Sequence, residues 1–345
     1  MTVATPVKTM AYRQADGAPW IGLPAVVSDG TVSNEDMIRN AGLLDWNINL
    51  VEVQPEVVGM TTLIHEDGTE EVVPEYEEVD TPSFKVMRTN PETGLPHRLA
   101  IVGNRYHEVQ NEALIAMADN ITDGDATLVA AGHYNNGRRV FMSFELGDNI
   151  VLDPEGSADA IGRHLTVMAG HDGGLGISFH THAMRLRCQN MLTSIRMSAM
   201  GSFKARHTQN VEGRILEARK ALSIGFKATE EWTKEMEALM AVEVTDAKFQ
   251  KIIEGLFPRP EKDVKGSLAK WDNKVGALTG LWNGETTANL APTAYKAYNA
   301  LNEHLMWGST VRAGNVEGAL VKASGFDDTT NKQNLALYRA VLLAA

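Results

Sequence analysis

The chain of 345 residues contains a single cysteine, Cys188, so it cannot form an intramolecular disulfide. One cysteine also cannot supply a cysteine-based zinc site alone. No apolar run reaches the roughly eighteen residues that a membrane span needs, and residues 1–20 lack the apolar core of a secretory signal. These absences predict a cytoplasmic protein with no membrane partner, long enough to bury a core without disulfides.

The chain also lacks an excess of positive charge. It has 32 Lys and Arg against 44 Asp and Glu, a net charge of −12 at pH 7, which opposes general attraction to nucleic acid. The charges are unevenly distributed, however. Residues 52–80 include ten acidic residues and no Lys or Arg, whereas residues 181–227 include nine Lys or Arg and two acids. The sequence therefore predicts one acidic and one basic segment.

The hydrophobic pattern predicts an α+β fold. Apolar residues at helical spacing predict a helix over 108–121, and Asn135-Asn136-Gly137 is suited to the positive φ of a tight hairpin turn. From Asn190 onward the spacing is helical almost throughout. We expect a mainly antiparallel sheet with a crossing helix in the N-terminal half, and a helical C-terminal half. Strands are predicted over 47–53, 84–88, 98–102, 127–134, 138–146, 164–169 and 176–187.

The same pattern suggests three regions. Residues 1–40 are rich in Gly, Pro and small residues and are expected to form an N-terminal arm, although Ser33 or Asn34 can cap a short helix there. An α+β core domain is expected over 41–200 and a helical region over 201–345. Pro258 and Pro260 mark a further division near 258–262.

Motifs for nucleotide chemistry are missing. The chain has no Gly-Lys-Ser/Thr phosphate loop and no strand-to-helix dinucleotide fingerprint, and residues 172–176 (DGGLG) lie between predicted strands. No Gly-x-Ser-x-Gly elbow is present. Arg187 or a following helix N-terminus could activate Cys188, but cysteine is also a favoured small core residue, and that interpretation is preferred. We therefore expect neither a cofactor nor an enzymatic activity.

Histidines offer the main alternative to that view. His180 and His182 are two residues apart on a predicted strand, so both point to one face, and His171 precedes them. Converging imidazoles are typical metal ligands, although no Asp or Glu lies at a diagnostic spacing. A metal-dependent enzyme built on these three histidines is the alternative that the pattern leaves open.

The basic segment predicts a surface for phosphates. Arg185 and Arg187 share a strand face, and guanidinium groups match phosphate oxygens in a bidentate manner. The same cations could instead pair with an acidic surface of another subunit or of a protein partner. The residues predicted to bind nucleic acid are Arg138, Arg139, Arg185, Arg187, Gln189, Asn190, Arg196, Lys204 and Arg206.

Seven short segments, in order over about residues 41–307, resemble a phage- and plasmid-encoded protein family known only as a domain of unknown function. The resemblance implies a phage or mobile-element origin and a bacterial host cytoplasm, and it transfers no catalytic residue. The segments are 41–46 (AGLLDW), 102–111, 137–141 (GRRVF), 171–173 (HDG), 185–190 (RLRCQN), 206–208 (RHT) and 299–304.

A more distant similarity, in element order and in the placement of cations, is to phage single-strand annealing proteins. It implies an oligomeric protein that binds and anneals single-stranded DNA in recombination or replication. Annealing requires charge neutralisation and strand alignment, and therefore no metal or nucleotide cofactor. The alternative is a non-enzymatic oligomer that binds a host or phage protein.

Overall fold

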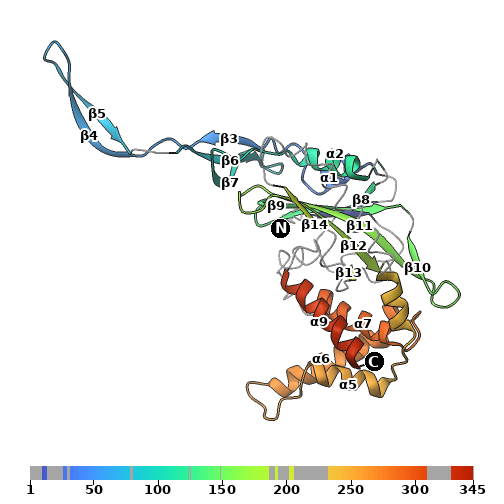
Figure 1. Cartoon of the computed structure of the whole chain (residues 1–345). Coiled ribbons are helices and arrows are strands. Elements are labelled where there is room, and N and C mark those ends of the chain that lie inside the picture. Colours follow the sequence, from blue (N-terminus) through green and yellow to red (C-terminus); the bar gives the residue numbers. More distant parts are fainter. Residues whose placement is uncertain are drawn as a thin grey trace, which may run out of the picture.

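The structure is a computed structural model. It describes residues 10–13, 26–28, 32–77, 81–122, 124, 126–147, 149–185, 191–192, 202–205, 232–308 and 328–344. Figure 1 shows three parts: a large sheet with helices above it, a cluster of helices below it, and a two-stranded arm that extends away from both. Both strands and helices are therefore present, as the predicted α+β class requires.

The largest sheet forms the centre of the molecule. Its strands run in the order β13-β12-β11-β9-β8-β1-β2, with β10 beside β11 and β14 beside β12. Every pair is antiparallel except β1 with β2, which confirms the mainly antiparallel prediction. The strands are β1 (Met10–Arg13), β2 (Val26–Ser28), β8 (Ala126–Tyr134), β9 (Arg139–Leu146), β10 (Ile150–Leu152), β11 (Asp159–Gly170), β12 (Ile177–Arg185), β13 (Met191–Leu192) and β14 (Ser202–Ala205).

The hairpin between β8 and β9 turns at the predicted residues. Asn135, Asn136 and Gly137 have φ values of 53°, 55° and 84°. Asn and Gly tolerate this left-handed region because a short polar side chain or a missing Cβ relieves the steric clash. The turn places Arg138 at the end of the sheet, immediately before β9.

Two helices cover one face of this sheet. They are α1 (Asn34–Asn40), whose first turn donates the Asp36 amide to Ser33 Oγ at 3.0 Å, and α2 (Asn111–Thr122). Trp46 packs with both helices in the same core and is fully buried. The helix predicted from residue 108 begins at Asn111. Gln110 is instead held by the Ile48 backbone, through hydrogen bonds of 2.9 and 2.7 Å.

The described part of residues 1–40 belongs to this core, where an N-terminal arm was expected. Ala11 of β1 and Met37 of α1 are fully buried, and Arg13 Nε donates to the Leu128 carbonyl of β8 at 2.6 Å. The composition of the segment is that of a loop, but pairing with β8 recruits its short apolar runs into the sheet.

A smaller sheet lies beside the first. It consists of β3 (Asn49–Glu52), β6 (Ser83–Thr89) and β7 (Pro96–Gly103), in the order β3-β6-β7, so that β7 is an edge strand. One face buries Val86 in the core shared with α1 and α2. The other face leaves Val51 and Ile101 exposed.

The acidic segment forms a separate hairpin. Strands β4 (Val57–Ile64) and β5 (Glu70–Tyr76) make a two-stranded sheet of their own. The hairpin lies within the predicted acidic segment, residues 52–80. It is called the arm below and comprises residues 57–76, which extend beyond the body in Figure 1.

The helical cluster closes the other end of the molecule. Its core contains Trp232, Phe249 and Tyr298, and it also takes in Ile161 and Ala183 from the large sheet. No helix among the described residues is long and apolar enough to cross a membrane. The elements are helical residues 232–240, α5 (Asp246–Leu256), α6 (Ser267–Trp282), the 3-10 helix η2 (Glu285–Thr287), α7 (Ala294–Glu303), the π-helical η3 (His304–Gly308) and α9 (Asp328–Ala344).

Two short strands fall where helix was predicted. Residues 191–192 and 202–205 both pair antiparallel with β12, at different parts of that strand. Propensity favoured helix for these segments, but the unpaired backbone of β12 supplies hydrogen-bond partners that override it. The division of the chain near residue 200 stays a prediction.

Candidate functional site

A groove runs along the edge strand β7. It consists of two adjoining hollows of about 820 and 390 Å³, which share Ile101 and Asp172 in their walls. The larger hollow extends over Arg105 and Tyr106, and the smaller one lies between Arg98 and Arg138. Together these hollows are called the basic groove, defined by Arg98, Ile101, Arg105, Tyr106, Arg138 and Asp172.

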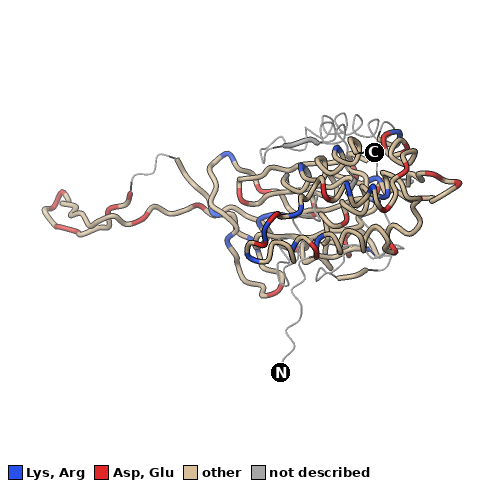
Figure 2. Tube along the Cα trace, turned by 90° about the horizontal axis from the view of Figure 1, so that it is seen from below, with Lys and Arg blue, Asp and Glu red and all other residues tan. Residues whose placement is uncertain are grey.

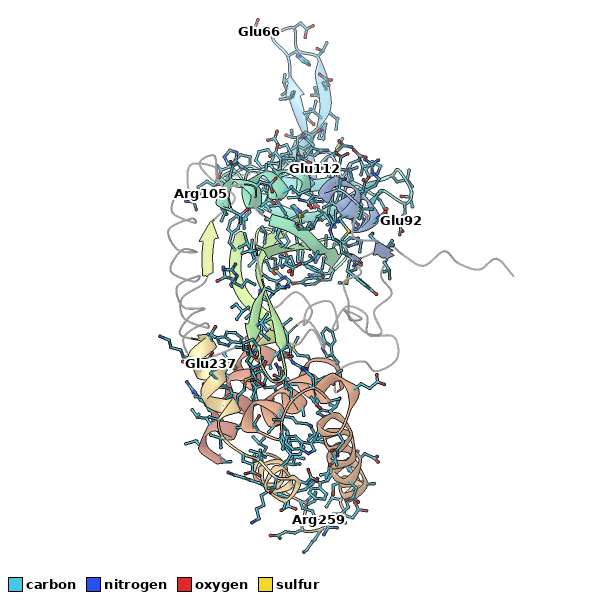
Figure 3. The ribbon with its side chains drawn as sticks, turned by 90° about the vertical axis from the view of Figure 1, so that its right-hand side faces the viewer. Glu66, Glu92, Arg105, Glu112, Glu237 and Arg259 are labelled. Carbon is cyan, nitrogen blue, oxygen red and sulfur yellow. The ribbon has the colours of Figure 1, made fainter. Side chains whose placement is uncertain are left out.

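Three exposed arginines come to this groove from separate elements. Arg98 lies on β7, Arg105 on the loop that follows β7, and Arg138 on the β8–β9 turn. Figure 3 shows Arg105 on the outer side of the body, away from the helical cluster. Because each guanidinium can donate two parallel hydrogen bonds, the groove can hold several phosphate or carboxylate groups at once.

A fourth arginine shapes the wall of the groove. Arg139 forms an ion pair with Asp172, whose Oδ1 also accepts a hydrogen bond from the Gly174 amide at 2.9 Å. Burial alone raises the pKa of Asp172, but the hydrogen bonds from Arg139 and Gly174 outweigh it and lower that pKa below its usual value. Asp172 is therefore ionised at neutral pH and neutralises Arg139, which makes Arg139 a positioning residue of the turn.

The groove region is positive around β7. Burial lowers the pKa of His97, and the positive charges of Arg88 and Arg138 lower it further. On the opposite wall, burial raises the pKa of the Tyr106 hydroxyl, and the neighbouring Asp172 adds to this rise. At neutral pH the groove therefore presents the positive charges of Arg98, Arg105 and Arg138, for which no ion pair is found among the described residues, with Asp172 already engaged.

Arg88 supports the turn that carries Arg138. Its guanidinium lies over the Trp46 ring, with 3.9 Å from Cζ to the ring centroid, and is 7% exposed as a residue. A Cβ on Gly137 would lie 2.7 Å from Arg88 Cζ, so a larger residue would displace the buried guanidinium, and the φ of 84° is a second reason for glycine here. Trp46, Arg88 and Gly137 thus fix the position of Arg138.

The structure overturns the prediction for Arg185. Its side chain is fully buried, and Nε donates to both carboxylate oxygens of Asp159, at 2.9 and 2.7 Å. The other guanidinium nitrogens donate to the Thr286 carbonyl and, at 2.9 Å, to Asn289 Oδ1. Arg185 cannot contact a nucleic-acid backbone because all its donors face inward. Its role is structural: it joins β12 to the helical cluster.

The other residues predicted to bind nucleic acid lie wholly or partly outside the described residues, apart from Arg138 and Arg139. Lys204 lies on β14 opposite Ser178, with its side chain outside the described residues. Those outside the described part of the chain altogether are Arg187, Gln189, Asn190, Arg196 and Arg206, and so is Cys188. Their part in binding stays a prediction, whereas Arg138 and Arg139 lie at the basic groove.

The histidines do not converge. His171 Nε2 lies 3.0 Å from Asn111 Oδ1, on the α2 side of the large sheet. His180 and His182 alternate along β12 with Phe179, whose side chain packs on that α2 side, so they face the opposite way. In the described part of the chain, no three His, Cys, Asp or Glu side chains are grouped to hold a metal ion. The metal site proposed for these histidines is therefore wrong.

Residues 98–336 match the family model described as "Domain of unknown function (DUF932)", which is more than half of the chain. The chain belongs to this family. The description names no enzymatic reaction. No curated protein matches the chain, and no solved structure does either. Three of the short segments noted in the sequence, 102–111, 137–141 and 171–173, contribute residues to the basic groove.

Sequence reasoning missed Arg98 and Arg105. Arg98 begins the predicted strand over 98–102 and Arg105 follows it, but nothing local shows that the edge of this strand borders the turns at 138 and 172. The sequence feature that could have identified them is their position at the two ends of a strand rich in apolar residues, because loops beside such strands often carry binding residues.

Proposed function

We propose that this protein binds single-stranded nucleic acid, with the backbone held in the basic groove. The observation that carries the proposal is that Arg98, Arg105 and Arg138 come from three separate elements to one continuous groove and stay exposed there. A repeating anion such as a phosphodiester chain is the ligand that such a row of guanidinium groups suits.

The shape of the groove favours a single strand. The groove is bounded by β7 on one side and by the glycine turn at 173–176 on the other, and a flexible backbone can follow it more readily than a rigid duplex. Tyr106, which packs partly against the core, also lines the larger hollow and is the aromatic side chain there that a base would stack on. Aromatic stacking and phosphate contacts together give binding with little sequence preference.

The proposal extends to strand annealing for a phage or mobile element, in recombination or replication. This extension is supported by the sequence resemblance and by the chemistry, since annealing requires neutralised backbones and no bond making. The negative charge elsewhere on the protein would confine the nucleic acid to the groove rather than let it coat the surface.

The test is fluorescence-anisotropy binding of a labelled oligonucleotide, single-stranded and duplex, at low and physiological salt. The variant Arg98→Ala/Arg105→Ala/Arg138→Ala is expected to bind much more weakly than the parent. Its matched control, Lys251→Ala/Lys262→Ala/Lys270→Ala, removes the same charge from exposed positions in the helical cluster and should behave as the parent does. Equal binding by the two variants would refute the groove as the site.

A further inference from the structure

The arm projects away from the body of the molecule. Strands β4 and β5 pair only with each other among the described residues, and Figure 3 shows Glu66 at the tip, far above the body. Eight residues of β4 give the arm a reach of about 26 Å at about 3.3 Å per residue. An isolated two-stranded hairpin is marginally stable in water, so a partner surface would stabilise it.

One face of the arm is apolar. The register opposes Met60 to Pro74 and Thr62 to Val72, and places Ile64 on the same face two residues further along. Met60, Val72 and Ile64 are 64%, 62% and 73% exposed. Large apolar side chains grouped on an exposed two-stranded element mark an interaction site, because water contact with this surface is unfavourable.

The arm is also strongly acidic. Residues 57–76 contain five Asp or Glu and no Lys or Arg. Figure 2 shows the acidic positions spread along the arm, whereas Lys and Arg lie on the body. Glu70 shares the apolar face with Ile64, directly across the hairpin. The matching surface on a partner must therefore be both apolar and basic.

The basic groove and the adjoining sheet have this character. Val51, Lys85 and Ile101 are opposite one another across β3, β6 and β7, so they form one row on the outer face of the small sheet. Val51 and Ile101 are 46% and 54% exposed. Arg98 and Arg138 line the groove beside Ile101. The same chain thus carries both complementary surfaces.

We propose that the arm of one copy docks against the basic groove of a second copy, with Met60, Ile64 and Val72 over the exposed row and the arm carboxylates beside the groove arginines. The two surfaces differ, so each copy can dock its own arm on one neighbour and receive the arm of another neighbour in its groove. Such a heterologous contact builds rings or filaments rather than closed pairs. The proposal goes beyond nucleic-acid binding and does not depend on it, but an arm in the groove would compete with nucleic acid there.

Analytical ultracentrifugation of the full chain with paired charge reversals tests this contact. The arm variant is Glu66→Lys/Glu70→Lys/Glu75→Lys and the groove variant is Arg98→Glu/Arg105→Glu/Arg138→Glu; all six side chains are exposed. The control, Glu237→Lys/Glu254→Lys/Glu261→Lys, carries the same charge change as the arm variant on the helical cluster. The parent and the control should form large assemblies, and each test variant alone should sediment at the 37.6 kDa of one chain.

A mixture of the two test variants decides the matter. The reversed arm of one variant matches the reversed groove of the other, and their remaining arm and groove also match, so mixing should restore the assemblies. The inference is overturned by a parent that is a single chain, by assemblies that survive either reversal, or by a mixture that stays dissociated. Oligonucleotide binding by the same parent protein is scored separately, so failure of the proposed function would leave these results interpretable.

Discussion

Arg185 and Asp159 form an ion pair in which the side chains are 0% and 1% exposed. The Asp159 carboxylate also accepts a hydrogen bond from the Tyr295 hydroxyl at 2.8 Å and from Asn289 Nδ2 at 3.3 Å. Arg185 lies on β12 and Tyr295 on α7, more than a hundred residues apart. The pair therefore connects the large sheet to the helical cluster through buried polar contacts.

Replacing Arg185 with Met should destabilise the fold. The substitution leaves the Asp159 carboxylate buried without its cation, and removing one partner of such a pair costs about 3–5 kcal/mol. Urea denaturation would measure the change in the free energy of unfolding. Lys251→Met, at an exposed position on α5, is the control and should change that free energy by less than about 0.5 kcal/mol. A stable Arg185→Met protein would contradict the structural role assigned here.

Single substitutions in the basic groove should each change the salt dependence of binding. A protein that neutralises one phosphate of a single strand contributes about 0.7 to the slope of log affinity against log salt. Arg138→Ala should therefore make this slope shallower by about 0.7, and the triple variant by about 2. The measurement is an anisotropy titration repeated at several salt concentrations. Slopes that match the parent would show that Arg138 contacts no phosphate.

Stability should fall as the pH is lowered toward 5, partly because of His164. Burial lowers the pKa of His164 to about 4, and its ring stacks on that of His182 at 5.4 Å. The unfolded chain, with the usual histidine pKa, takes up a proton below about pH 6.5 while the folded chain does not. His164 should therefore cost about 1–2 kcal/mol of stability by pH 5.

The check is thermal denaturation of the parent and His164→Gln between pH 8 and pH 5. The variant cannot titrate at this position, so its melting temperature should depend less on pH over that interval, even if it is lower at pH 8. Parallel curves for the two proteins would show that His164 is not the group responsible.

Gly137→Ala should destabilise the fold for two reasons that can be separated. The residue has a φ of 84°, and an added Cβ would lie 2.7 Å from Arg88 Cζ. Gly124, just after the core helix α2, has a similar φ of 80° but nothing within 4 Å of such a Cβ. Gly124→Ala thus measures the backbone strain alone, about 1 kcal/mol, and Gly137→Ala should cost about 1–3 kcal/mol more. Equal melting temperatures would mean that Arg88 moves aside freely.

Sequence reasoning succeeded where local chemistry decides the structure. Ser33 caps α1 through its own side chain, and Asn135-Asn136-Gly137 forms the turn because these residues tolerate positive φ. It failed for Arg185 because Asn289 and Tyr295, which surround the guanidinium and its carboxylate, are distant in sequence. A basic strand looks the same in sequence whether its cations face solvent or a buried carboxylate.

The groove was found only in part for the same reason. Arg138 stood out as part of a cationic pair, but its neighbours Arg98 and Asp172 come together through sheet register and turn packing. The alternative of a metal site is not supported because His180 and His182 share one face of β12, while His171 belongs to the turn on the other side.

The core shared by α1, α2 and Trp46 has a practical consequence for anyone who would express the DUF932 segment by itself. Residues 98–336 contain α2, but Met37, Trp46 and Val86, which pack in the same core, all precede residue 98. A fragment cut at that boundary would expose this apolar surface to water and leave the β8 edge without β1. The smallest piece that folds therefore starts upstream of β1, and a recombinant fragment trimmed to the homology boundary should aggregate.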